Sequence, residues 1–483
     1  MILLPFTFKR LDNNKVFIVN IVGEFLIINK LHFEMLVNED FKFIPEDIKM
    51  QLLARHFICG KEDLEFTEDL LAIKLRTKKD YLSDFTSLHM VVLTLRCNCM
   101  CSYCHASSKG LDEDNKRYDM SIETAQKTVD MIFESPSNYI KIEFQGGEPL
   151  LNWPVLKYIV MYAEGKNQQK NKNLSFVICT NLLSIDEEKL LFIKKHNIDI
   201  STSCDGPQYY HDKNRKSLIS ASAYETFINN LHLCKKFLGE NAVSALLTVT
   251  KGNLYNLREV VDEYRNLGFK NVFIRALNPY GYAVDNKESL FYDVKDFIEE
   301  YKKALRYIIE LNLKGIYFEE SYATLLLQRI LTPFSTGFVD LQSPCGAGIS
   351  GVIYYYNGDV YPADEARMLA TRGNKKFLMG NVKQDSFYDI FYGKVIKELV
   401  YKSCVESLPG CANCAFNIYC GADPIRYYVE SESIVGKRYN SGFCEKNKAM
   451  IDEMIKYLSE NEMQVMRVFW SWINKTPLGE SNV

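Results

Sequence analysis

Residues 88–104 read LHMVVLTLRCNCMCSYC, an apolar run that leads directly into a loop holding four cysteines. The part from His89 to Leu95 is apolar and partly β-branched, which predicts a short buried β-strand. Cys97, Cys101 and Cys104 follow with the spacing Cys-x3-Cys-x2-Cys, so that one tight loop can present three thiolates to a single object. The segment therefore predicts a strand whose carboxyl end carries a metal-binding loop.

The same strand-like pattern recurs along the next part of the chain, with helical patterns between the strands. Alternation repeated six times predicts parallel strands joined by crossover helices. Six units are too few to close an eight-fold barrel, so the expected fold class is α/β, with a partial (β/α)6 TIM-like barrel over residues 86–320, whose chemistry gathers at the C-terminal ends of the strands. The expected strands are His89–Leu95, Tyr139–Phe144, Leu174–Thr180, Ile198–Ser203, Ser244–Thr250 and Asn271–Ala276, and the expected helices are 121–134, 153–164, 186–196, 222–237, 255–267 and 293–312. Ser121 is expected to cap the first helix, and Asn152 with Pro154 to open the second.

Smaller regions flank this barrel. Residues 1–85 predict an α+β module of winged-helix-like character, with a strand pair turning at Gly23 and three helices behind it. Residues 321–450 are rich in Gly, Tyr and Cys and their regular elements are short, and residues 451–483 predict a C-terminal helical segment. In the first module the expected strands are Lys15–Val19 and Glu24–Asn29, and the expected helices lie around 31–38, 45–57 and 67–80.

The composition indicates a globular protein of the cytoplasm. The 483 residues carry a formal net charge of −3 and are 47% hydrophobic, so no basic excess suggests a nucleic-acid partner. No apolar run is long enough to span a membrane, and the apolar start MILLPF is too short for a secretory signal. The fourteen cysteines are partly clustered, which in a cytosolic chain favours metal or redox chemistry over disulfides.

Three thiolates in one loop suit an iron–sulfur cluster, because thiolates are soft ligands. Three ligands on a 4Fe–4S cube leave one iron open, and that iron can chelate the amino and carboxylate groups of S-adenosylmethionine. Cys99 is out of phase with the other three cysteines and is interpreted as a bystander. The spacing, with an aromatic residue before the last cysteine, resembles the signature of the radical S-adenosylmethionine (SAM) superfamily. The alternative is a zinc knuckle or a chance grouping.

Further motifs follow the predicted strands. Gly146-Gly147-Glu148-Pro149 follows the second strand; the two glycines permit a close backbone approach to a ligand, and the carboxylate can accept hydrogen bonds from a cationic amino group. The motif resembles the one that binds the SAM amino group in the superfamily, which implies that the cationic amino group is that of SAM. By the same resemblance four residues at later strand ends contact the ribose or carboxylate, although each also has a plain structural reading as a turn or a surface charge: Thr180, Asn181, Ser203 and Arg215. Leu182 stands where such families usually have Gly.

A second cysteine set lies near the C-terminus: Cys411, Cys414, Cys420 and, further on, Cys444. Alone, this set fits a zinc site equally well. In this context it resembles the SPASM extension of radical enzymes that modify peptides, which implies the full ligand set of an auxiliary 4Fe–4S cluster.

The SPASM pattern has a further auxiliary cluster, and here its ligands are mostly missing. Cys345 matches the opening ligand, but Ala363 and Pro424 stand where cysteines are expected. We therefore expect one auxiliary cluster rather than two, with Cys404 left open as a recruited ligand.

Asp364 follows Ala363 directly, at a place where sulfatase-maturing relatives have an Asp that deprotonates the substrate. The resemblance implies a general base. The alternative is that Asp364 caps a helix beginning at Glu365.

Longer stretches narrow the resemblance to the His-Xaa-Ser system radical SAM maturases, over nearly the whole chain. It implies a small ribosomal precursor peptide as substrate, a leader-peptide-recognition role for residues 1–85, and a one-electron donor such as flavodoxin or ferredoxin. The alternatives are an anaerobic sulfatase maturase that makes formylglycine and a non-enzymatic zinc or peptide-binding protein. The stretches that carry the resemblance are Leu4–Arg10, Phe144–Asn152, Ile198–Pro207, Thr332–Ser343, Asp359–Leu369 and Glu406–Pro424.

Overall fold

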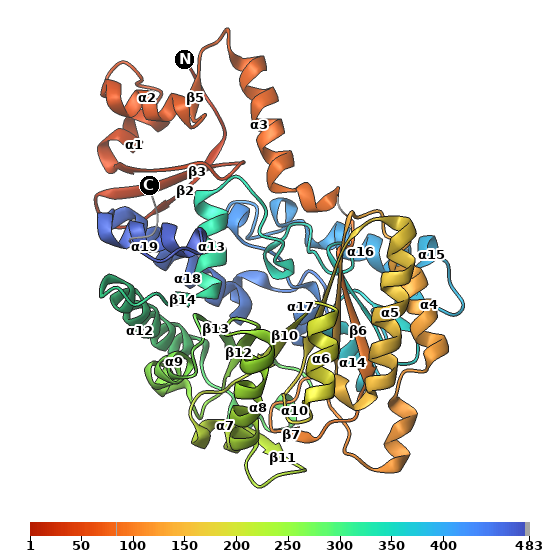
Figure 1. Ribbon diagram of the computed structural model, residues 1–483. Coiled ribbons are helices and arrows are strands. Elements are labelled where there is room, and N and C mark those ends of the chain that lie inside the picture. The colour runs from red at the N-terminus through yellow and green to blue at the C-terminus, as the bar shows by residue number, and fades with distance from the viewer. Residues whose placement is uncertain (84, 479–483) are drawn as a thin grey trace. The chain divides into compact units, whose positions relative to one another are not determined.

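The computed structural model describes residues 1–83 and 85–478, and the chain divides into two compact units (Figure 1). One unit contains the N-terminal module, a segment at 323–345 and the chain from 401 onward. The other contains residues 84–322 and 346–400. Each unit is described by itself.

The second unit is built on a ten-stranded sheet that contains all six strands predicted from the sequence. These six pair in parallel in the order β13-β12-β10-β9-β8-β6, as strand–helix alternation requires. Helices cover the sheet in Figure 1, which confirms the α/β class and the TIM-like arrangement. The bounds are β6 Leu88–Thr94, β8 Tyr139–Gly146, β9 Asn173–Cys179, β10 Ile198–Ser203, β12 Val243–Val249 and β13 Asn271–Ala276.

Four short strands extend this sheet beyond the predicted six. The two-residue strand β14 (Glu319–Glu320) pairs with β13, and β15 (Gly351–Tyr354) pairs in parallel with β6. Two more follow β15 in antiparallel pairing, β16 (Asp359–Tyr361) and β17 (Gly380–Asn381). The partial barrel therefore continues into the residues that carry Asp364.

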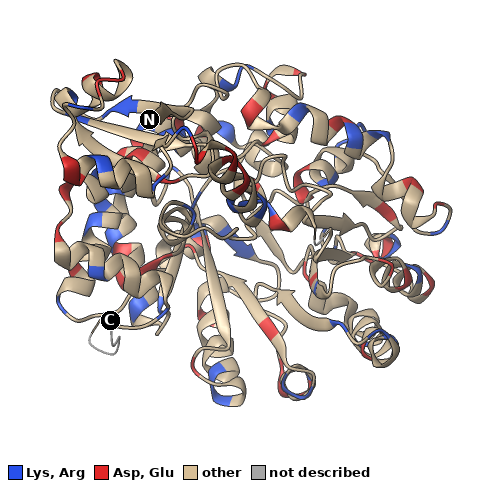
Figure 2. Cartoon of the chain, turned by 90° about the horizontal axis from the view of Figure 1, so that it is seen from above, with Lys and Arg blue, Asp and Glu red and all other residues tan. Residues whose placement is uncertain are grey.

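The crossover helices lie where the apolar periodicity places them. In α9 (Leu257–Asn266), for example, Leu257, Val260, Val261 and Tyr264 are buried, three and four residues apart along one face. Lys and Arg are interspersed with Asp and Glu along the helices in Figure 2. The others between the barrel strands are α4 Ile122–Ile132, α5 Trp153–Lys170, α6 Glu187–Lys195, α7 Gln208–Asn214, α8 Ala223–Leu238, α10 Tyr282–Asp285, α11 Lys287–Leu290 and α12 Val294–Leu313.

Both helix openings predicted from sequence are confirmed. Ser121 caps α4, since its side chain accepts a hydrogen bond from the Thr124 amide. Asn152 is the N-cap residue of α5 and Pro154 lies in the first turn, although the Asn152 side chain makes no capping bond. The side-chain amide of Asn152 donates to the carbonyls of Leu93 and Met120, at 2.9 and 3.1 Å. These bonds place the side chain beside the end of β6.

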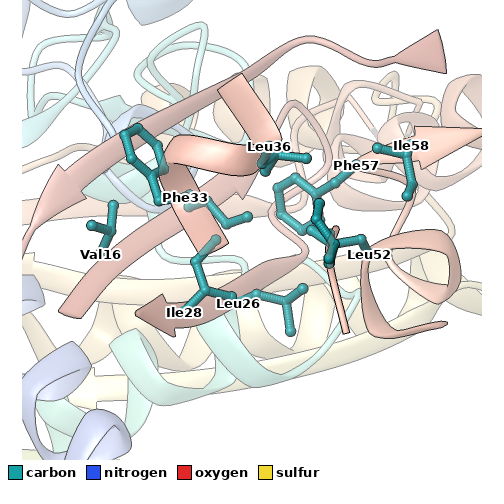
Figure 3. Close-up of a cluster of buried hydrophobic side chains, with 10 residues drawn as sticks. Val16, Leu26, Ile28, Phe33, Leu36, Leu52, Phe57 and Ile58 are labelled. Atoms are coloured by element: carbon teal, nitrogen blue, oxygen red, sulfur yellow. The ribbon is translucent and has the colours of Figure 1, made fainter. Parts of the chain in front are cut away.

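The N-terminal module of the first unit has a three-stranded antiparallel sheet in the order β2-β3-β4. Its ten-residue core, which includes Phe33, Leu36 and Phe57, is drawn in Figure 3. The elements are β2 Phe6–Arg10, β3 Lys15–Asn20, β4 Phe25–Asn29, α1 Lys30–Val37, α2 Glu46–Ala54 and α3 Leu64–Lys78, with a small pair formed by β1 Ile2–Leu3 and β5 Ile58–Cys59. The sequence pattern alone missed β2, β1 and β5.

The later part of the chain is mostly helical. Of the predicted C-terminal helical segment, 451–483, the described part contains the end of one helix and a second helix, and residues 479–483 lie outside the described residues. The helices of this later part are α13 Ser321–Leu331, α14 Asp364–Thr371, α15 Phe387–Phe391, α16 Lys394–Ser403, α17 Pro424–Ser431, α18 Gly442–Glu460 and α19 Met463–Ile473. Among the described helices, none combines the length and the apolar character that crossing a membrane requires.

Candidate active site

The first cysteine loop follows β6, at the carboxyl end of the strand. Its middle part forms β7 (Cys99–Cys101), which pairs antiparallel with β11 (Arg215–Ser217) and so places Arg215 opposite Cys101. The two residues lie 4.0 Å apart from Nη1 to Sγ. A positive charge is thus held beside one of the three candidate thiolates.

The three thiols of the loop lie close enough to act on one another electrostatically. Burial and then the charge of Cys101 raise the pKa of both Cys97 and Cys104. For Cys101 the contact with the Cys99 thiol raises the pKa most, followed by burial. Thiols with raised pKa values in one loop need a nearby cation to ionise them, and the iron of a cluster would supply it.

Nitrogen donors also face this loop. The Cys99 amide donates to Cys97 Sγ at 3.4 Å, and Asn181 Nδ2 lies 3.7 Å from the same sulfur. Within residues 1–83 and 85–478, no three His, Cys, Asp or Glu side chains stand at the spacing of ligands to one metal ion. Thiolates on a cubane cluster bind different irons and so stand further apart than ligands of one ion. The chemistry of the loop fits a three-thiolate cluster.

Gly146, the last residue of β8, and Gly147, which follows it, pack closely against the chain at the cysteine loop. A Cβ on Gly146, whose φ is +145°, would stand 2.2 Å from the Thr94 carbonyl oxygen, and a Cβ on Gly147 would stand 2.2 Å from the Arg96 carbonyl oxygen. The Gly147 amide donates to Thr94 at 2.8 Å, and the Glu148 amide to Arg96 at 2.8 Å. The close approach expected from sequence is thus made to the backbone at the end of β6 and at the start of the cysteine loop.

Gly147→Ala is expected to displace the cysteine loop, since its new methyl group meets backbone atoms that cannot rotate away. We expect a loss of about 1–3 kcal/mol in the free energy of unfolding, the usual range for overpacking. Urea denaturation of the anaerobically purified protein measures it. The matched control is Gly165→Ala inside α5, where a Cβ meets nothing within 4 Å. That change is expected to stabilise the helix by about 0.5–1 kcal/mol. Equal stability of the two variants would contradict the tight contact.

Glu148 joins the ends of two strands. Its fully buried carboxylate accepts hydrogen bonds from Thr180 Oγ1 at 2.8 Å, from the Asn181 amide at 2.9 Å and from the Leu150 amide at 3.1 Å. Burial raises the pKa of Glu148 to about 7. A carboxylate has about four acceptor positions, so these donors leave about one for a ligand ammonium. Thr180, which is expected at the ribose, also donates to this carboxylate.

Asp205 is a second buried carboxylate beside the cysteine loop, and the sequence analysis did not single it out. It accepts hydrogen bonds from Tyr103 Oη at 2.8 and 2.9 Å and from Asn214 Nδ2 at 3.1 Å, and it lies 3.3 Å from Arg215 Nε. Asp205 therefore orients Arg215 toward the loop. The predicted Ser203 lies half-buried at the end of β10.

Asp364 is the first residue of α14, and the N-cap position is taken by Ala363, so Asp364 is not the cap of a helix beginning at Glu365. Arg367, one turn further and 1% exposed, donates from Nε to Asp364 Oδ1 at 2.9 Å. Both residues act electrostatically on His105, whose pKa is lowered to about 4 first by burial and then by Arg275. His105 directly follows Cys104, so these charged groups and the cysteine loop belong to one region. The sequence analysis missed His105, Arg275 and Arg367.

The second cysteine set converges within the other unit. Burial, followed by the charges of Cys444, Cys414 and Cys411 in that order, raises the pKa of Cys420 to about 12. Ser441 caps α18 by accepting the Cys444 amide at 3.1 Å, which places Cys444 in the first turn of that helix. Four thiols that act on one another fit a four-thiolate cluster site.

The positions expected to lack ligands are occupied by structural residues. Ala363 is the N-cap of α14 and Pro424 is the first residue of α17, and neither side chain can bind a metal. Cys345 is buried, and its amide donates to Ser403 Oγ at 2.9 Å. Burial and then Glu406 raise the pKa of Cys404.

Comparison with known proteins agrees with this geometry. Residues 91–263 match the model of the radical SAM superfamily. The chain is 24% identical over 352 residues to a cysteine-type anaerobic sulfatase-maturating enzyme of Clostridium perfringens, covering 69% of this chain and 91% of that protein. It is 32% identical over 219 residues to an uncharacterized protein of Methanocaldococcus jannaschii, covering 45% of this chain and 70% of that one.

Two solved structures share the fold. Native anSMEcpe with bound AdoMet matches with a TM-score of 0.63 and 19% identity, over 78% of this chain and 100% of that one. SuiB of Streptococcus suis, bound to its precursor peptide SuiA, matches with a TM-score of 0.51 and 12% identity, over 91% of this chain and 98% of that one. Together with the cysteine loop at the end of β6, these matches show that the chain is an enzyme of the radical SAM superfamily, which uses a 4Fe–4S cluster and S-adenosylmethionine.

Proposed function

We propose that this enzyme modifies a small ribosomal precursor peptide, by a crosslink or another oxidation of a side chain. The observation that carries the proposal is the extent of the structural match. The fold of SuiB, solved with its precursor peptide, covers 91% of this chain, whereas that of anSMEcpe covers 78%. A chain that shares nearly the whole architecture of a precursor-binding enzyme has room for the same kind of partner.

The N-terminal module supplies a place for the leader of such a peptide. In its sheet β3 is central, so β2 and β4 are the outer strands, and an extended peptide can add to an outer strand through backbone hydrogen bonds. Phe8 on β2 is 49% exposed beside that edge. Alternate apolar side chains of a leader can pack on such a ring.

The roles of the barrel residues follow from their positions. Cys97, Cys101 and Cys104 hold the cluster, which with SAM supplies a 5′-deoxyadenosyl radical when both are bound. Glu148 has acceptor capacity left for the SAM ammonium. The guanidinium of Arg215, which Asp205 orients, can bind a carboxylate.

The remaining polar groups near the loop are assigned to the substrate. Asp364, held by Arg367, is in our proposal the base that takes a proton from the peptide as it is oxidised. Cys411, Cys414, Cys420 and Cys444 hold one auxiliary 4Fe–4S cluster.

A one-electron donor such as flavodoxin or ferredoxin must reduce the enzyme, and such donors share the cytoplasm.

A second candidate is the conversion of Cys or Ser to formylglycine in a sulfatase. It is favoured by the sulfatase-maturating relative of Clostridium perfringens, 91% of whose length is matched. The missing cysteines at Ala363 and Pro424 and the additional N-terminal module speak for the first candidate.

The two candidates are separated by their products. The reconstituted enzyme is incubated anaerobically with SAM, a one-electron reductant and either a synthetic precursor peptide with repeated His-Xaa-Ser units or a sulfatase peptide containing cysteine. We expect mass spectrometry to show loss of hydrogen from the precursor peptide without a hydrazine-reactive aldehyde. Formation of that aldehyde in the sulfatase peptide, with the precursor unchanged, would establish the second candidate.

A further inference from the structure

Arg438 is a buried cation beside the second cysteine set. Its side chain is 2% exposed, and its guanidinium carbon lies 4.7 Å from the centre of the Tyr427 ring. Nε donates to the Val435 carbonyl at 2.9 Å, and Nη2 donates to the Lys402 carbonyl at 3.0 Å. These contacts hold the guanidinium in one orientation.

The third nitrogen of this guanidinium, Nη1, does not donate to a carbonyl as the other two do. Nη1 is buried and has no hydrogen-bond partner within the part of the chain that the structure describes. A buried donor without an acceptor is costly, so one in a native fold needs an explanation. The group also carries its full charge into the interior, where an uncompensated charge costs more than a neutral donor.

The cysteine set lies within electrostatic reach of this cation. Burial raises the pKa of Cys411, and the charge of the Arg438 guanidinium opposes that rise; the same charge acts on Cys444. Arg438 is also tied to another of the four cysteines. Its carbonyl accepts from the Ser441 amide at 3.1 Å and from Ser441 Oγ at 2.9 Å, and Ser441 in turn caps the helix that carries Cys444.

We propose that Arg438 is a positioning residue that aims Nη1 at the sulfur atoms of the auxiliary cluster and raises the reduction potential of that cluster. The inference rests on the auxiliary cluster of the proposed function. Hydrogen bonds to the sulfurs, net charge and solvent exposure set the potential of an iron–sulfur cluster. A fixed cation in a water-excluded site favours the reduced form, because that form carries one more negative charge.

Lys448 is the matched comparison. It also acts on Cys411 and on Cys444, but it is exposed, so water and salt screen its charge. Loss of this charge is expected to move the potential much less than loss of the buried one.

The test is a redox titration of the reconstituted full-length enzyme, followed by electron paramagnetic resonance, with iron content measured on each sample. The variants are Arg438→Gln, Arg438→Lys and the control Lys448→Gln. In Arg438→Gln we expect the ratio of reduced to oxidised auxiliary cluster at a fixed potential to fall about tenfold, equal to a shift of ~59 mV for a one-electron couple. Arg438→Lys keeps the charge and is expected to shift less, and the SAM-binding cluster is expected to be unchanged in all three.

The outcomes separate the inference from the proposed function. Wild-type protein without an auxiliary cluster would overturn the proposed function and the inference with it. An auxiliary cluster whose potential is the same in wild type and in an iron-loaded Arg438 variant would overturn the inference alone. Loss of the auxiliary iron in both Arg438 variants would also overturn it, because Arg438 would then be a structural residue of the cysteine loop.

Discussion

We expect the Cys101→Ala variant to produce no 5′-deoxyadenosine from SAM under reducing conditions in which the wild type produces it. Cys101 lies in β7 opposite Arg215, and the loop offers three thiolates, so the loss of one leaves the cluster with two protein ligands. The expected effect is complete loss, since the open iron that SAM needs exists only in the assembled cluster. Chromatographic assay of deoxyadenosine after anaerobic reconstitution measures it.

Cys99→Ala is the matched control for this prediction. Cys99 lies two residues away in the same strand, is 2% exposed, and its thiol contacts that of Cys101. It is outside the ligand spacing, so its replacement is expected to leave both iron and deoxyadenosine in place. Deoxyadenosine from Cys101→Ala, or its loss only in Cys99→Ala, would show that the ligands have been assigned incorrectly.

The second large effect concerns the C-terminal cysteines. We expect the wild type to hold roughly eight irons after anaerobic reconstitution, and a variant lacking Cys411 and Cys414 to hold roughly four, since each cubane cluster contributes four. The physical reason is the convergence of these thiols with Cys420 and Cys444, so that removal of two leaves half a ligand set. Iron and sulfide analysis measures the result.

Each other iron count has a definite meaning. About twelve irons in the wild type would mean that a further auxiliary cluster exists despite Ala363 and Pro424. About four, unchanged in the variant, would make the C-terminal cysteines a zinc site or structural thiols. Cys404→Ala is the companion variant: unchanged iron leaves Cys404 outside the ligand set, and a fall would make it the recruited ligand.

Much of the barrel could be predicted from the sequence because its strands are buried apolar runs with clear boundaries. The strand Ile198–Ser203 has the same bounds in the structure as in the prediction. Strand β15 was missed because it is four residues long and pairs with β6, more than two hundred residues earlier in the chain. Nothing local marks such a pairing, since its stability comes from the neighbouring strand.

The candidate site was predicted to a different degree in its different parts. The cysteine loop and the Gly-Gly-Glu motif could be predicted from sequence. Three thiolates at short spacing suit one metal cluster, and two adjacent glycines allow a close backbone approach. Family membership also removes the reading of a non-enzymatic zinc or peptide-binding protein. The partners of Glu148 were not readable, since Thr180 and Asn181 meet it only where β8 and β9 end side by side.

By itself, therefore, the sequence determined the ligand spacing, the alternation of strands and helices and, through both, the superfamily. Only the tertiary structure decided which polar groups share a buried space: Asp205 with Tyr103 and Arg215, and Arg438 with Cys411. The physical reason is the distance along the chain over which each kind of interaction acts. Periodicity and loop spacing act over a few residues, whereas the cost of burying a charge is met by whichever distant group the fold brings beside it.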